Sequence, residues 1–185
     1  MIRPTRKMVF LFCALLLGTS SLQARSGKEE NEKSCVHVAQ AFYNWYVRRV
    51  FRGFKTSSGE ATWHAALKYK GDLFSDDLTQ ALIKSDVEAK ADGDPVLDFD
   101  PILNSQDPAE RYVVRRVTRK GGSCWAEVYG DWTEPRIDQG KRPQVVAEMA
   151  FMNNHWQFVN FHYPDDSSTA DVNLLSMLGL EYRPK

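Results

Sequence analysis

The sequence predicts a single α+β domain, because helix-like spacing of apolar residues in the first half of the chain gives way to strand-like alternation in the second. Apolar side chains recur every three or four residues in two stretches before residue 93, and they alternate with polar ones from residue 111 onward. Helices followed by consecutive strands favour an antiparallel meander over a parallel α/β sheet. A hydrophobic content of 43% is typical of a globular chain.

A first amphipathic helix is predicted from Ser34 to Val50, with the Ser34 hydroxyl as its N-cap. His37, Gln40 and Asn44 form part of a polar stripe on the opposite side. One face is therefore expected to pack against the rest of the domain. That apolar face consists of Cys35, Val38, Ala39, Phe42, Trp45, Tyr46 and Val50.

A second helix is predicted to begin after Ser75, whose hydroxyl can accept from a free backbone N–H group of the first turn. Asp76 and Asp77 favour this start, because their carboxylates lie at the positive end of the helix dipole. Gly93 is expected to end the helix. Whether residues 61–69 form another short helix stays open.

Four antiparallel strands are predicted after an aspartate- and proline-rich link over residues 92–108. The glycine pair at 121–122 and the asparagine pair at 153–154 provide tight turns, since both residue types tolerate left-handed backbone. Residues 169–179 are expected to form a last helix. The strands are residues 111–119, 123–133, 144–152 and 155–163.

Residues 1–24 are expected to be a signal peptide, in which three cations precede an apolar core of eleven residues, Met8–Gly18. Ala24 is the expected last residue removed, with cleavage after Ser21 as the alternative. The core falls short of the roughly 20 residues that span a bilayer, so no membrane anchor is expected after cleavage. Residues 25–33 have no apolar side chain and are expected to be a flexible tether. The protein is therefore expected to be periplasmic or secreted.

Without the expected leader, the chain carries 21 basic and 24 acidic side chains, a net charge of −3. Because nucleic-acid binding requires a basic surface, no nucleic-acid partner is expected. Residues 34–185 are expected to form one domain, since their number fits a single hydrophobic core. Neither a nucleotide cofactor nor a metal is expected, because phosphate-binding glycine motifs are absent and the four histidines lack metal-ligand spacing.

Cys35 and Cys124 are the two cysteines that remain after the expected leader is removed. Both are expected to point into the core, Cys35 from the apolar helix face and Cys124 from a strand. Export to an oxidising compartment favours a disulfide between them. Two buried free thiols are the alternative, because sequence alone does not give the required Cα separation of about 6 Å.

Three stretches of the sequence are distinctive as a set: residues 42–46 (FYNWY), residues 97–107 (LDFDPILNSQD) and residues 163–164 (YP) before a leucine-rich tail. Together they resemble an uncharacterised family of exported bacterial proteins, periplasmic proteins and lipoproteins, which is similar to the nuclear transport factor 2-like superfamily. The resemblance implies helices laid on a strongly curved antiparallel sheet, shaped like a cone with a pocket at its open end. It implies no particular activity, since that superfamily includes both enzymes and binding modules.

The acidic link contains most of the candidates for a ligand-binding site. Its carboxylate and amide oxygens suit a polar ligand, and two tyrosines of the first helix can donate to one. Ca²⁺ is a weaker alternative, because Pro101 and Ile102 stand where a calcium loop has a ligand and a glycine. The favoured interpretation is structural, with the link side chains capping turns. The candidate ligand-binding residues are Tyr43, Tyr46, Asp98, Asp100, Asn104 and Asp107.

Acid–base groups on the strands are the candidates for catalysis. They are Glu127, Asp131, Glu148 and His162 as bases, and Tyr129 as a donor. Glu127 and Glu148 are expected on the solvent face, because polar residues that alternate with apolar ones usually face water. No spacing rule places any of these groups, so no catalytic residue is assigned. Arg115 and Arg119 are expected to share one solvated face, with an acidic partner as the alternative.

The leading functional hypothesis is a non-catalytic binding or interaction module that recognises another envelope protein or a small apolar ligand. A small pocket enzyme of isomerase or dehydratase type is the first alternative. An inhibitor or immunity protein directed at an envelope-acting toxin is the second. A buried carboxylate facing a cavity distinguishes the enzyme, and an exposed apolar patch bordering an acidic surface distinguishes the inhibitor.

Overall fold

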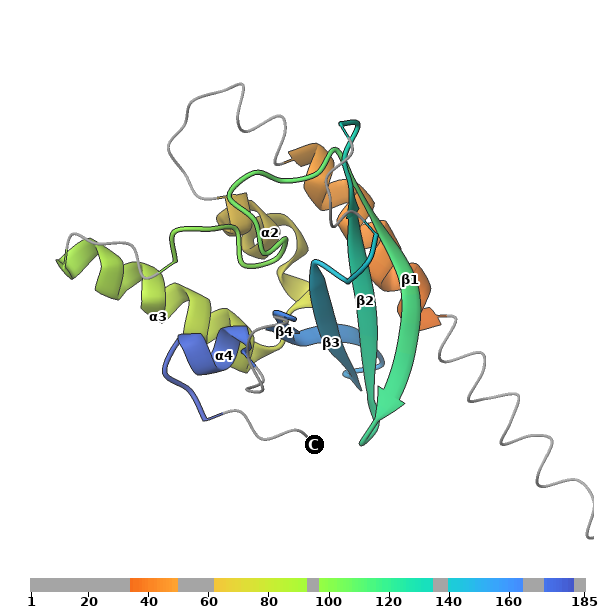
Figure 1. Ribbon diagram of the computed structural model, residues 1–185. Helices are drawn as coiled ribbons and strands as arrows, with labels where there is room; N and C mark the ends of the chain where they lie inside the picture. Colours follow the sequence, from red (N-terminus) through yellow and green to blue (C-terminus); the bar gives the residue numbers. More distant parts are fainter. Residues whose placement is uncertain (1–33, 50–61, 93–96, 135–139, 165–171, 182–185) are drawn as a thin grey trace, which may run out of the picture.

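The fold comes from a computed structural model that describes residues 34–49, 62–92, 97–134, 140–164 and 172–181. Four antiparallel strands form one sheet in the order β1-β2-β3-β4, with helices before them and a short helix after them (Figure 1). The predicted α+β class is confirmed. The expected leader and tether lie outside the described residues. In the part that is described, no helix is both long and apolar enough to cross a bilayer.

The four strands form in the four stretches where alternation predicts them. In the hairpin turns, the glycine pair at 121–122 has φ values of 55° and 89°, and the asparagine pair at 153–154 has values of 51° and 66°. These left-handed conformations match the twist of tight hairpins, and glycine and asparagine adopt them most readily. The strands are β1 (Arg111–Lys120), β2 (Ser123–Asp131), β3 (Val145–Met152) and β4 (His155–His162).

Helices precede the sheet, and the first of them, residues 34–49, lies alongside β1 and β2 (Figure 1, orange). Ser75 caps the next long helix as predicted, because its Oγ accepts from the Leu78 N–H at 3.3 Å. Most of the stretch 61–69, left open by its sequence, is helical. The elements after the first helix are α2 (Thr62–Lys70), the 3₁₀ turn η1 (Gly71–Leu73) and α3 (Asp76–Asp92).

The sheet has a helix face and an outer face that differ in composition. The helix face of β2 and β3 is buried in a core shared with the first helix, and the rings of Phe42 and Phe158 meet there with centroids 4.8 Å apart. The outer face carries the intervening residues of β2, which are Trp125, Glu127 and Tyr129, with their cross-strand partners. The helix face includes Cys124, Ala126, Val128, Ala147, Met149 and Phe161.

Both edges of the sheet are partly covered. At the β1 edge, the Gln40 side chain donates to the Tyr112 carbonyl at 3.0 Å and accepts from the Val114 N–H at 2.8 Å. At the β4 edge, the Ser75 N–H donates to the Phe158 carbonyl at 2.9 Å. The Gln40 side-chain amide therefore satisfies two backbone groups of β1 that a neighbouring strand would otherwise bind.

The C-terminal helix is shorter than expected. Of the predicted 169–179 helix, the described part is helical only over α4 (Leu174–Met177). Asn173 is extended and caps α4, because its Oδ1 accepts from the Ser176 N–H at 3.1 Å. The buried Asn160 amide donates to the same oxygen at 2.9 Å and so holds Asn173 beside β4. The contact between Asn160 and Asn173 thus keeps Asn173 extended, and α4 begins directly after it.

Candidate functional site

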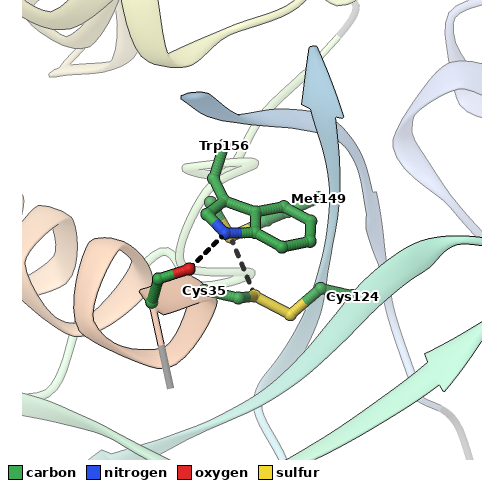
Figure 2. Close-up of a disulfide and its surroundings, with 5 residues drawn as sticks. Cys35, Cys124, Met149 and Trp156 are labelled. Carbon is green, nitrogen blue, oxygen red and sulfur yellow. Dashed lines mark hydrogen bonds between the residues drawn. A yellow bond between two sulfur atoms is a disulfide. The ribbon is translucent and has the colours of Figure 1, made fainter. Parts of the chain in front are cut away.

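A disulfide joins the first helix to β2, as the sequence predicts. Cys35 and Cys124 are bonded, with their Cα atoms 6.7 Å apart, and both residues are completely buried. Figure 2 shows Met149 and Trp156 beside the bond, with the Met149 sulfur 3.8 Å from the Cys35 sulfur. The Trp156 indole N–H donates to the Ser34 hydroxyl at 2.8 Å. The disulfide is therefore part of the core and does not face solvent.

Asp100 organises a tight loop over residues 100–105, named the Asp100 loop below. Its ends are paired through the backbone, since the Asp100 N–H donates to the Ser105 carbonyl at 3.1 Å and the reverse bond measures 3.4 Å. Inside the loop, Asp100 Oδ1 accepts from the N–H groups of Ile102 and Leu103 at 2.9 and 3.0 Å. The capping interpretation is thereby confirmed for this aspartate.

The second oxygen of Asp100 binds two hydroxyl groups. Tyr46 and Thr62 donate to Oδ2 at 2.7 and 2.5 Å, so the carboxylate accepts four hydrogen bonds in all. Burial raises the pKa of Asp100, and the four hydrogen bonds oppose that rise because they favour the charged form. Burial, and then the nearby Asp100 charge, raise the pKa of Tyr46 well above its usual range. Tyr46 therefore stays protonated as a donor.

Two further tyrosines hold the Asp100 loop through its carbonyl groups. Tyr43 donates to the Ile102 carbonyl at 3.3 Å, and Tyr163 donates to the Pro101 carbonyl at 2.9 Å. Burial raises the pKa of both tyrosines well above the usual range, so both stay protonated. Their hydroxyl groups are therefore occupied by backbone of the same chain.

The six predicted ligand-binding residues divide into two groups. The first is Tyr43, Tyr46, Asp100 and Asn104, which gather at the Asp100 loop, and the second is Asp98 and Asp107, which are exposed. Asn104 donates to the Gln144 carbonyl at 2.9 Å, and Asp98 accepts from Gln106 at 3.2 Å. Thr62 also donates to Asp100 at this loop, but the sequence pattern does not single it out, because the helical periodicity around it is weak. Among the described residues, no three His, Cys, Asp or Glu side chains could hold a metal ion.

Glu148 and His162 form a buried pair between β3 and β4. The two residues are 2% and 4% exposed, and Nε2 of His162 lies 3.1 Å from Oε2 of Glu148. The Trp125 ring stacks on the His162 ring with centroids 4.2 Å apart. The expectation that Glu148 faces water is therefore wrong. A central strand gives Glu148 neighbours on both sides, and His162 supplies a polar partner that makes its burial tolerable.

The remaining acid–base candidates take part in surface pairs on the outer face. Tyr129 donates to Glu127 at 3.0 Å, and Arg116 lies 3.8 Å from the same carboxylate. Burial raises the pKa of Tyr129, and the Glu127 contact adds to the rise. Asp131 accepts from the Nε of Arg111 at 2.9 Å. These carboxylates therefore balance cations of β1.

Cations of β1 lie over aromatic rings on both faces of the sheet. Arg115 occupies a β-bulge, and its guanidinium lies 4.6 Å from the centroid of Tyr129 on the outer face. Arg119 pairs with Cys124 and lies 4.9 Å from the Trp156 ring on the helix face. The expectation that the two arginines share one face is therefore wrong, because the bulge resets the alternation.

Comparison with known proteins gives no relative from which a function could be transferred. No protein-family model, no curated protein and no solved structure matches this chain. The resemblance to the exported bacterial family stays a prediction.

Proposed function

We propose that this protein is an exported, non-catalytic interaction module that binds an acidic segment of another envelope protein through the outer face of β1 and β2. One observation carries the proposal: Arg115 lies over Tyr129, and the Lys120 ammonium lies 4.3 Å from the ring of Trp125. Partly exposed aromatic rings beside exposed cations offer both apolar contact and charge to a partner.

The distribution of charge supports an acidic partner. The ten residues of β1 include five cations and no carboxylate, although the chain without its expected leader has a net charge of −3. Arg111 and Arg116 have carboxylate partners on β2, whereas Arg115 and Lys120 are exposed and contact rings. Strand β1, at an edge of the sheet, therefore carries five basic residues and no acidic one.

The buried polar groups favour binding over catalysis. Asp100 has its hydrogen-bonding capacity filled by four donors, so it is poorly suited to act as a base. The Tyr43 and Tyr46 hydroxyl groups, which could stabilise an oxyanion, bond to the Asp100 loop. A small apolar ligand in the cone is less favoured for the same reason, since these side chains are part of the packed core.

The isomerase or dehydratase alternative rests on the Glu148–His162 pair. A carboxylate within hydrogen-bonding distance of a histidine is the arrangement of a base with its orienting group. Such a pair would need access to substrate, and both side chains are almost fully buried. An inhibitor or immunity protein would use the same outer face as the proposed module, and the identity of its partner distinguishes the two.

Photo-crosslinking in the envelope of the native host tests the proposal. A photoreactive residue at Thr118, which pairs with Trp125 on the outer face, should give one defined adduct, and the same residue at the exposed Gln80 of α3 should not. The charge-reversed variant R115E/K120E should lose the adduct, because it removes the attraction for acidic groups. Equal adducts from both positions, or an adduct that survives charge reversal, would contradict the proposed surface.

A further inference from the structure

The His155 ring at the start of β4 lies between two backbone carbonyl groups. Its Nδ1 is 2.9 Å from the Asn153 oxygen, within the β3–β4 turn. Its Nε2 is also 2.9 Å from an oxygen, the carbonyl of Asp72 in η1, 83 residues earlier in the chain. The ring therefore connects the hairpin turn with the segment that leads into α3.

The protonation state of the ring decides whether both contacts can be hydrogen bonds. A neutral imidazole carries one N–H group and one lone pair, whereas an imidazolium carries two N–H groups. A carbonyl oxygen can only accept. When the ring is neutral, one nitrogen lone pair therefore faces an oxygen lone pair, and that contact becomes repulsive.

We propose that His155 is a proton-operated clamp, which holds η1 against the β3–β4 turn when protonated and loses one of its two bonds when neutral. This inference is independent of the proposed function. The clamp lies next to the junction of α3 with the sheet, because η1 leads directly to Phe74 and Ser75. Phe74 is 2% exposed, and the Ser75 N–H bonds to β4.

The groups around His155 raise its pKa, which favours the protonated ring that the clamp requires. The hydrogen bonds to Asp72 and Asn153 raise its pKa above 6.5, the Asp72 carboxylate adds to the rise, and burial opposes it. The other neighbour on β4, Gln157, is neutral and donates to the Asp72 carbonyl at 3.0 Å at any pH. Stabilisation by the clamp is therefore fully present below the unfolded-state pKa of about 6.5, and it disappears as pH rises through the folded-state value.

An NMR titration of the full chain tests the clamp. Below the His155 pKa, both ring nitrogens of this residue should carry protons, and the pKa should exceed that of an unstructured histidine, about 6.5. The Ser75 amide should exchange with solvent several-fold faster at pH 8 than at pH 5.5 after correction for intrinsic exchange. In H155Q, which can donate to one carbonyl but does not titrate, this change should vanish.

The matched control is H37Q, since His37 is an exposed histidine on the first helix. This variant should retain the pH dependence of the wild type. The clamp would be refuted by a His155 pKa at or below about 6.5, or by an equal change in Ser75 exchange in H155Q. A change that vanished in H37Q would also refute it.

Discussion

Replacing Cys35 and Cys124 together by alanine is expected to lower the free energy of unfolding by about 2–5 kcal/mol. The bond joins residues 89 positions apart, so its loss releases a large loop in the unfolded chain. Because both residues are completely buried, removing their sulfur atoms also costs packing in the core. Urea denaturation of the oxidised wild type and of the variant measures the difference.

Reduced wild-type protein is the control for this substitution. It has the same open loop but keeps both sulfur atoms, so its stability should fall close to that of the double variant. If reduction and the double substitution both leave the urea midpoint unchanged, the disulfide does not constrain the unfolded chain as expected. If only the substitution is destabilising, the loss comes from packing around Met149 and Trp156.

Asp100→Ala is expected to cost about 2–4 kcal/mol, because it leaves the buried N–H groups of Ile102 and Leu103 without an acceptor. Loss of a single helix or turn cap typically costs about 0.5–2 kcal/mol. The larger value reflects four lost hydrogen bonds at one site. Thermal and urea unfolding of the variant measure the effect.

Asp100→Asn is the matched control. Its side-chain carbonyl can still accept from Ile102 and Leu103, and its amide can donate to the hydroxyl oxygens of Tyr46 and Thr62. It also removes the cost of burying a charge. We expect less than half of the destabilisation that alanine causes. Equal effects of both substitutions, or no effect of alanine, would contradict the structural role of this carboxylate.

Local patterns in the sequence predicted most of the fold. Alternation predicts the four strands, and the glycine and asparagine pairs predict the hairpin turns. Ser75 predicts the start of α3. The disulfide followed from two apolar positions and the expected oxidising compartment. These features depend on residues close together in the chain or on burial of an apolar face, which periodicity reports directly.

Features that depend on distant partners were missed. Glu148 looks like a surface residue until His162, 14 positions later, is placed beside it. The bulge at Arg115 interrupts alternation without a glycine to signal it. In the candidate ligand site, the sequence predicts that Asp100 caps a turn. It does not predict the bond from Thr62 to Asp100, because the two residues are 38 positions apart. Periodicity and turn preferences contain no information about such pairs.

NMR mapping with an acidic probe peptide of alternating glutamate and leucine tests the proposed binding surface most directly. In the ¹⁵N-labelled protein, saturable shifts should appear at the backbone of Arg115 and Tyr129 and at the Trp125 indole N–H. The R115E/K120E variant should lose them, because binding depends on its cations. Shifts that gather instead around the Asp100 loop, or a wild type that shows none, would contradict the account.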